Sequence, residues 1–372
     1  MNRTYLTHAT VSVTILCGTL LCAAAPFPKG TSSEKPVAQS LDFVVFGRCN
    51  FAVAAQQSGI AGIDLKTRDV RWKALSDKIV DVGPVVANDS VAVITNSFGT
   101  IYAFSKASGK LLWRKEHHSN VLVSDGQYFY VARPDDDGVS ALDSRTGATV
   151  WTLQIPKRGG AAFLRIHDGS LYSNSFVVDL RSRKLIYEWP EDTAVTAIAF
   201  PSSGEVLLGD SEGNLTLYDS AFKLINRLHP GDTRVDAIAG NEAGILVSLA
   251  APDSGHQGHI ESLKWDGERR WDIPGLPIND MGFNPFAIVG GDALIVVPGK
   301  SEKEWRFESR NLATGKVNWS APEGNYFMGW PAVCGNMAFL RDGDHIRGFN
   351  VSDGAPYGSE AAKPVVYEIP QP

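Results

Sequence analysis

The sequence predicts an all-β fold, an eight-bladed β-propeller whose blades are four-stranded antiparallel sheets. A short pattern recurs along the 372 residues, most clearly as GTIYAFSKASGKLLW, which ends at Trp113, and as GVSALDSRTGATVW, which ends at Trp151. Its copies lie about 36 to 48 residues apart, the size of a four-stranded blade. Within a copy, short runs of β-branched and aromatic residues alternate with Gly, Asn and Asp, as in strands joined by tight turns.

Eight copies of the pattern can be aligned. A unit this small cannot bury its own apolar face, so the copies are expected to stack on one another around a ring. The anchor positions that end the copies are Trp72, Trp113, Trp151, Tyr187, Asn226, Trp271, Trp319 and Tyr357.

The Trp residues of the pattern follow a turn whose sequence is often Ser/Thr-Gly. The Gly supplies the positive φ of a hairpin turn before the fourth strand. The indole can then cover the face of the neighbouring blade, where twisted sheets diverge. A stacking platform for a ligand is the alternative, but the same spacing in copies with different loops favours packing. We therefore interpret five residues as structural anchors: Trp72, Trp113, Trp151, Trp271 and Trp319.

The segments that end at Trp113 and Trp151 resemble the tryptophan-docking repeat of the pyrroloquinoline-quinone (PQQ)-type β-propellers. The resemblance extends over roughly residues 40 to 370. That superfamily includes quinoprotein alcohol dehydrogenases and also non-catalytic, BamB-like propellers of outer-membrane protein assembly. The resemblance implies the fold rather than the quinone, because the repeat residues build blades and not the cofactor site.

Residues 1–25 are expected to be a secretory signal peptide. Arg3 precedes an apolar stretch at residues 11–21, and the small residues at 23–25 suit a cleavage site. The stretch is too short for a membrane span, which needs about twenty apolar residues. Lipidation at Cys22 is not favoured, because a lipoprotein leader carries a small residue where Leu21 stands.

The rest of the chain is expected to form one domain. Residues 26–40 are polar and rich in Pro, which is typical of a flexible tether. Residues 41–372 hold all the repeats and are interpreted as a single propeller. The net charge of −6 and the pI near 5.8 argue against nucleic acid as a partner, since that would require a basic face.

Two cysteines remain after the leader, Cys49 and Cys334. They occupy equivalent turns of the first and last copies, so closing the ring would bring them near each other. A disulfide between them would persist in an oxidising compartment. However, equivalent points of adjacent blades can be farther apart than the Cα separation of about 7 Å that a disulfide tolerates. A disulfide and two isolated buried thiols both remain open.

The sequence supports no catalytic residue. It contains no Cys-x-x-Cys-His for covalent haem and no Gly-x-Ser-x-Gly or phosphate-binding glycine loop. It also lacks the adjacent cysteine pair that the resemblance to catalytic quinoproteins would imply. We therefore expect no cofactor, with PQQ as the alternative.

Metal sites are not expected either. His117 and His118, like His256 and His259, lack further ligands at the spacing of a zinc site. Consecutive carboxylates at residues 135–137 splay apart instead of converging on a cation. All of these are interpreted as solvated loop residues.

One loop could contact a partner. Met281, Phe283 and Phe286 place apolar side chains in a stretch punctuated by Gly, Asn and Pro. Packing of this loop against the next blade is the alternative.

These observations lead to a functional expectation. The protein is expected to be an exported, periplasmic or extracellular, non-catalytic scaffold for protein–protein interaction, acting in the assembly of the cell envelope or of outer-membrane proteins. Its partner would be another envelope or secreted protein. The alternative is a propeller that binds PQQ or another small ligand as an oxidoreductase or sensor.

Overall fold

The computed structural model separates the chain into two units, Met1–Thr31 and Ser32–Pro372. The expected signal peptide and Cys22 lie outside the described residues. The residues that the structure describes are 36–39, 43–46, 49–56, 59–67, 69–75, 85–96, 98–117, 121–132, 138–155, 161–202, 204–250, 258–276, 285–299, 305–324, 331–342 and 345–357.

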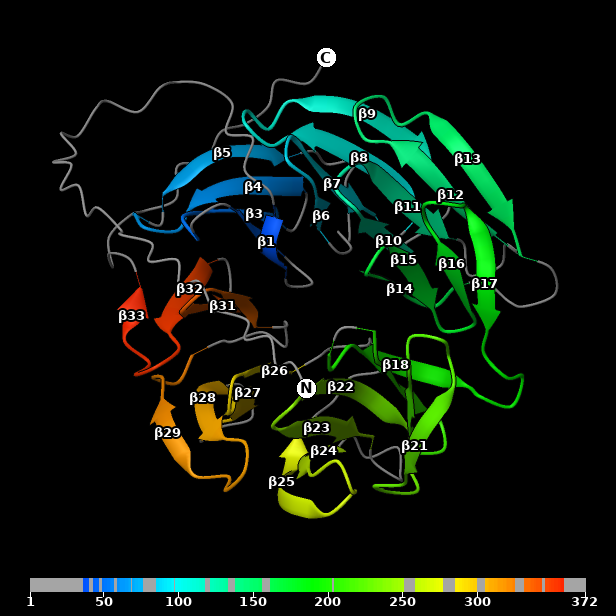
Figure 1. Ribbon diagram of the computed structural model, residues 1–372. Helices are drawn as coiled ribbons and strands as arrows, with labels where there is room; N and C mark the ends of the chain where they lie inside the picture. The colour runs from blue at the N-terminus through cyan, green and yellow to red at the C-terminus, as the bar shows by residue number, and fades with distance from the viewer. Residues whose placement is uncertain are drawn as a thin grey trace, which may run out of the picture. The chain divides into compact units, whose positions relative to one another are not determined.

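Eight antiparallel sheets follow one another along the second unit (Figure 1), and each is a meander of consecutive strands. The described residues contain strands and turns but no helix, and therefore no helix that is long and apolar enough to cross a membrane. The prediction of an all-β, eight-bladed propeller is therefore confirmed.

The first four blades are built as follows. Blade 1 holds β1 (Pro36–Gln39), β2 (Phe43–Phe46), β3 (Phe51–Gln56), β4 (Gly59–Asp64) and β5 (Val70–Leu75). Blade 2 holds β6 (Val86–Ala87), β7 (Val91–Thr95), β8 (Thr100–Ser105) and β9 (Leu111–Glu116). Blade 3 holds β10 (Val121–Ser124), β11 (Tyr128–Ala132), β12 (Gly138–Asp143) and β13 (Thr149–Gln154). Blade 4 holds β14 (Leu164–His167), β15 (Ser170–Ser173), β16 (Phe176–Asp179) and β17 (Lys184–Glu188).

The second four blades repeat this plan. Blade 5 holds β18 (Val195–Ala199), β19 (Val206–Asp210), β20 (Leu215–Tyr218) and β21 (Leu224–Leu228). Blade 6 holds β22 (Val235–Asn241), β23 (Gly244–Leu249), β24 (Gly258–Leu263) and β25 (Arg269–Leu276). Blade 7 holds β26 (Phe286–Val289), β27 (Asp292–Pro298), β28 (Trp305–Asn311) and β29 (Val317–Ser320). Blade 8 holds β30 (Ala332–Cys334), β31 (Met337–Asp342), β32 (His345–Asn350) and β33 (Pro356–Tyr357).

The tether expected at residues 26–40 requires a correction at its end. β1 pairs antiparallel with β2, so Pro36–Gln39 is a fifth strand of blade 1. The Pro in this segment suggests a tether, but Pro is tolerated at the first position of an edge strand because no ladder hydrogen bond needs its missing N–H.

The apolar core lies between the blades. In blade 2 every residue of β7 is buried, whereas only Trp113 is buried in the outer strand β9. One core cluster combines residues of blades 1 and 2, such as Val53 and Ile94, which are both fully buried. Each blade therefore hides its apolar faces against its neighbours, as the repeat pattern requires.

Four junctions between blades share one arrangement. The indole N–H of the Trp in a fourth strand donates to a backbone carbonyl in the next blade, at 2.7 to 2.9 Å. The ring lies over the Gly of that blade's third-to-fourth-strand turn. At Gly147, with φ of 70°, a Cβ atom would come within 2.7 Å of the Trp113 indole. We call these the indole junctions, and their pairs are Trp72 with Gly109, Trp113 with Gly147, Trp271 with Gly315, and Trp319 with Gly354.

Three consecutive junctions differ, and we call them the substituted junctions. From blade 3 to blade 4, the Arg183 guanidinium lies 6.0 Å from the centre of the Trp151 ring. From blade 4 to blade 5, Tyr187 stacks on Phe222 with ring centres 4.5 Å apart. From blade 5 to blade 6, the Asn226 side-chain amide donates to the Trp265 carbonyl at 3.1 Å.

The junction between the last and first blades carries a covalent link. Cys49 and Cys334 form a disulfide with their Cα atoms 5.9 Å apart, although 285 residues separate them in sequence. The pair lies at a core cluster shared by blades 8 and 1. Because every blade is made of consecutive strands, this bond is the covalent tie between the two ends of the ring.

Candidate functional site

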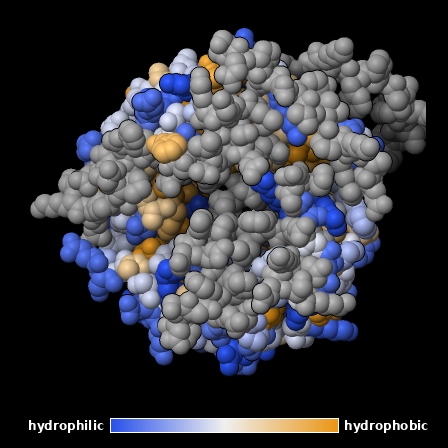
Figure 2. All heavy atoms as spheres, turned by 180° about the vertical axis from the view of Figure 1, so that it is seen from behind, coloured by the Kyte–Doolittle hydropathy of each residue, from blue (hydrophilic) through white to orange (hydrophobic). Residues whose placement is uncertain are grey.

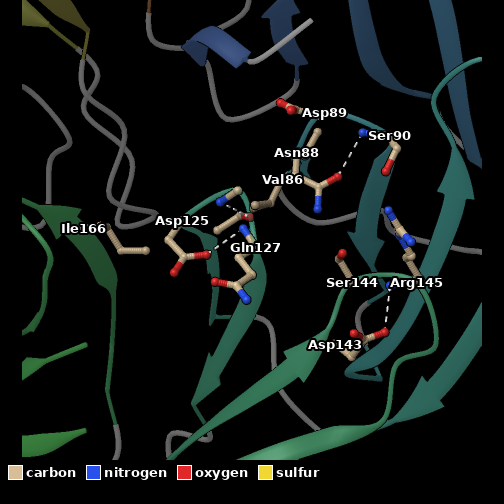
Figure 3. Close-up of a pocket in the computed structure, with 13 residues that line it drawn as sticks. Val86, Asn88, Asp89, Ser90, Asp125, Gln127, Asp143, Ser144, Arg145 and Ile166 are labelled. Atoms are coloured by element: carbon tan, nitrogen blue, oxygen red, sulfur yellow. Dashed lines mark hydrogen bonds between the residues drawn. The ribbon is translucent and has the colours of Figure 1, made fainter. Parts of the chain in front are cut away.

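A pocket of about 870 Å³ opens where turns of blades 2 and 3 meet (Figure 3). Its walls come from the turn between β6 and β7, the turn between β10 and β11, and the turn between β12 and β13. Ile166 of β14, in blade 4, lines one end. Three rigid hairpin turns from two blades therefore surround one polar space.

Asn88 is the most buried polar side chain of this pocket, at 2 % exposure. Its side-chain oxygen accepts the backbone N–H groups of Ser90 at 3.1 Å and Val91 at 2.9 Å. Those bonds fix the turn and orient the amide, whose nitrogen points into the pocket (Figure 3). Among the described residues the Asn88 amide N–H groups have no acceptor, so they are available to donate to a group that enters the pocket.

Asp125 presents a fixed carboxylate to the same pocket. One oxygen accepts the backbone N–H groups of Gln127 and Tyr128, both at 2.8 Å. The other oxygen accepts the Tyr130 hydroxyl at 2.6 Å. Burial, together with this hydrogen bond, raises the pKa of Tyr130, so the phenol keeps its proton and keeps donating to Asp125.

Asp143 is held in a similar way on the opposite wall. One of its oxygens accepts the Thr146 hydroxyl at 2.8 Å and the backbone N–H groups of Thr146 and Arg145, at 2.9 and 3.1 Å. The hydrogen bonds from Thr146 lower the pKa of Asp143 below its usual value. The carboxylate is therefore ionised at neutral pH.

Two further charged side chains line the pocket. Asp89 and the Arg145 guanidinium form no hydrogen bond or ion pair with other described residues. The lining thus carries three carboxylates and a single guanidinium, which gives the pocket an excess of negative charge. A rigid, polar wall of this kind suits recognition, since its oriented groups need no reorganisation on binding.

The pocket residues were not singled out by the sequence. Asn88 and Asp89 resemble ordinary turn residues there, because Asn and Asp cap the turns of many strands through their own side chains. The one feature that could have pointed to them is the run of polar residues in the first-to-second-strand turns of successive copies.

The expected interaction loop is only partly described. Met281 and Phe283 lie outside the described residues. Phe286 opens β26 and is 2 % exposed, in a core cluster between blades 6 and 7. The position of Phe286 agrees with the alternative that this stretch packs against a neighbouring blade, because its side chain is already used in packing.

The histidines also fall into two groups. His118, His256 and the acidic run at residues 135–137 lie outside the described residues. His259 is in β24, with its Nε2 atom 3.2 Å from Glu261. Within the described part of the chain, no three His, Cys, Asp or Glu side chains are arranged to hold a metal ion.

Comparison with known proteins places this geometry in a family. The family model described as "Outer membrane protein assembly factor BamB" matches residues 56–252, which is more than half of the chain. The chain belongs to this BamB family of PQQ-like propellers. No curated protein sequence matches it.

Solved structures agree with this family at the level of the fold. BamB from Moraxella catarrhalis superimposes with a TM-score of 0.61 at 16% identity, over 85% of this chain and 98% of that one. The computationally designed Ika8 protein gives 0.62 at 13% identity, over 85% and 97%. A chain of the mitotic checkpoint complex gives 0.53 at 15% identity, over 74% and 96%.

PQQ does not fit the pocket. The quinone carries three carboxylates, and the pocket lining carries three of its own against one guanidinium. Like charges within a few ångströms repel, so this BamB-family pocket disfavours such an anion. On the face shown in Figure 2, most coloured residues are hydrophilic, and the hydrophobic ones form a few separate patches.

Proposed function

We propose that this BamB-family propeller is an exported, non-catalytic scaffold that binds another protein during assembly of the cell envelope or of outer-membrane proteins. The observation that carries the proposal is the rigid polar pocket, whose Asn88 amide and Arg145 guanidinium have no partners among the described residues. Such oriented and unpaired groups on hairpin turns are typical of a recognition surface built on a stable scaffold.

The proposed location outside the cytoplasm has two supports. The N-terminal 25 residues have the pattern of a secretory leader. The disulfide between Cys49 and Cys334 suits an oxidising compartment, where such bonds persist. We propose a periplasmic or extracellular protein without a lipid anchor at Cys22.

Crosslinking in cells tests the proposal. A photoreactive residue at Gln127, an exposed position of the pocket rim, should capture a protein of the envelope fraction when the full chain is expressed with its leader. The same residue at Asp266, in a turn of blade 6 outside the pocket, is the matched control. Equal capture at both positions, or none at Gln127, would contradict a partner at this pocket.

A titration addresses the quinone alternative. We expect no saturable change in the absorbance of PQQ when purified protein and calcium are added, and no reduction of a dye in the presence of alcohols. Saturable binding with dye reduction would overturn the scaffold proposal in favour of an oxidoreductase.

A further inference from the structure

We infer that the pocket receives a Lys or Arg side chain carried on an extended segment of the partner, with the Asn88 amide donating to a backbone carbonyl of that segment. This inference rests on the proposed protein-binding function and specifies its ligand. It draws on three properties of the pocket: its excess of carboxylates, the oriented Asn88 amide donor, and its single guanidinium.

Two of the three carboxylates are held in place. Asp125 and Asp143 each accept three hydrogen bonds from groups of their own blade. Asp89 adds a carboxylate that has no hydrogen bond or ion pair with other described residues. A cation entering the pocket would therefore meet two carboxylates that already hold their positions.

The amide donor favours a peptide over a simple cation. Asn88 cannot turn its amide away, because its oxygen holds the Ser90 and Val91 N–H groups. Its N–H groups can donate to an acceptor on the ligand, which neither an ammonium group nor a metal ion offers. A backbone carbonyl next to a basic side chain supplies both partners, an acceptor for Asn88 and a cation for the carboxylates.

Arg145 limits the affinity. Its guanidinium lines the pocket and repels an incoming cation, although it can donate to a second carbonyl of the segment. The pocket is therefore suited to a weak and reversible contact with one basic residue rather than to a strongly basic chain.

Peptide binding followed by saturation-transfer NMR tests this ligand. The probe is acetyl-Gly-Lys-Gly-amide, and its matched control is the same peptide with norleucine in place of Lys, which keeps the four-carbon side chain but lacks the ammonium group. We expect the Lys peptide to bind the full-length mature protein with a Kd of about 1 mM at low salt. The norleucine peptide should bind at least about fivefold more weakly. Equal binding of the two peptides, or no binding of the Lys peptide, would overturn the inference.

Substitution of Asp89 tests the contribution of charge. Asp89→Asn should weaken binding of the Lys peptide about three- to tenfold and leave the norleucine peptide unaffected. The variant is expected to fold, because the Asp89 side chain holds no bond of the turn. The control Glu242→Gln makes the same change in the equivalent turn of blade 6 and should alter nothing. An unchanged affinity in Asp89→Asn would contradict the inference.

Substitution of Asn88 separates the donor from the charge. Asn88→Asp keeps the oxygen that caps the turn, but it removes the amide donor and adds a negative charge. We expect weaker binding of the Lys peptide, because its carbonyl would then face a carboxylate. Tighter binding would show that the pocket attracts cations by charge alone and would overturn the role of the amide. An unchanged melting midpoint checks that the variant folds.

Substitution of Arg145 should change the affinity for the Lys peptide in the opposite direction. Arg145→Gln should tighten binding of the Lys peptide about threefold. Weaker binding would show that Arg145 attracts the peptide instead of repelling its cation, which would contradict the part that the inference gives to charge. Capture of a partner in cells by a protein that does not bind the Lys peptide would contradict this ligand and leave the scaffold function standing. Binding of the peptide without any captured partner would support this ligand and contradict the scaffold function.

Discussion

The two kinds of blade junction solve the same packing problem with different side chains. At the indole junctions, a Trp of one blade lies on a Gly of the next and donates to its backbone. At two of the substituted junctions, Arg183 and Phe222 take the place of that Gly, and the contact becomes a cation over a ring or a stack of two rings. The backbone of the turn nevertheless keeps its conformation, since Arg183 and Phe222 have φ values of 56° and 58°.

This difference shows that the packing of one blade on the next, and not the presence of Gly, determines the backbone conformation of the turn. A residue other than Gly in the left-handed region costs about 1 to 2 kcal/mol. The junction of blades 4 and 5 offsets this cost with aromatic contacts, each worth about 0.5 to 1.5 kcal/mol beyond area burial. His167 stacks on Phe200 with ring centres 4.2 Å apart, and Trp189, which is fully buried, contacts Phe222 edge to face.

The largest effect is expected where neither kind of contact closes the ring. Replacing both Cys49 and Cys334 by Ala removes the covalent tie between blades 8 and 1. Since the loop spans 285 residues, the free energy of unfolding should fall by about 4 to 5 kcal/mol. Urea unfolding of the oxidised protein and of the variant measures this loss.

A reduced sample of the unmodified protein is the control for that experiment. It should unfold at the urea concentration of the double variant. If reduction left the midpoint unchanged, non-covalent packing would be sufficient to close the ring.

Removal of one indole from each kind of junction should give unequal losses. Trp319 is 9 % exposed, packs on Gly354 and donates to the Val351 carbonyl, so Trp319→Ala should cost about 3 to 4 kcal/mol. Trp151 is more exposed and faces a solvated guanidinium, so Trp151→Ala should cost about 1 to 2 kcal/mol. The measurement is the unfolding midpoint of each variant, and equal losses would show that the two junctions are energetically equivalent.

The fold could be predicted from the sequence because its determinants are local. The turn Gly and the Trp that follows it lie within one short segment, as Gly109 and Trp113 do. The pocket could not be predicted in this way, because Asn88 and Asp143 come from different blades and meet only after the ring forms. Phe286 illustrates the same limit, since the Gly and Pro beside it suggest a loop although it starts a buried strand.

Substitution of the turn residue should have unequal effects on stability at the two kinds of junction. Gly147→Ala places a Cβ atom 2.7 Å from the Trp113 indole at a positive φ, and should cost about 2 kcal/mol. Arg183→Gly relieves the positive φ and loses only a partly solvated cation–π contact, so stability should change by less than about 1 kcal/mol. Thermal unfolding of the two variants checks the contrast. A large loss of stability in Arg183→Gly would show that the cation–π contact with Trp151 contributes strongly to this junction.

The smallest effect concerns a feature that both kinds of junction share. Asp143 in blade 3 and Asp179 in blade 4 occupy the same turn position, and hydrogen bonds from Thr146 and Ser182 lower their respective pKa values. A lowered pKa stabilises the fold above the unfolded pKa near 4, and this stability is lost as the pH falls through the folded pKa. Asp143→Asn and Asp179→Asn should therefore slightly lower the unfolding midpoint at pH 7, and the difference should vanish below about pH 3.

Equal effects at these two positions are the expected result, because each carboxylate caps a turn within its own blade. The two kinds of junction would then differ only through side chains that cross from one blade to the next. A larger loss for Asp143→Asn at neutral pH would indicate instead that the turn under Trp113 must be held more firmly than the turn under Trp151. In that case the position of the indole, and not only its contact area, would depend on the cap.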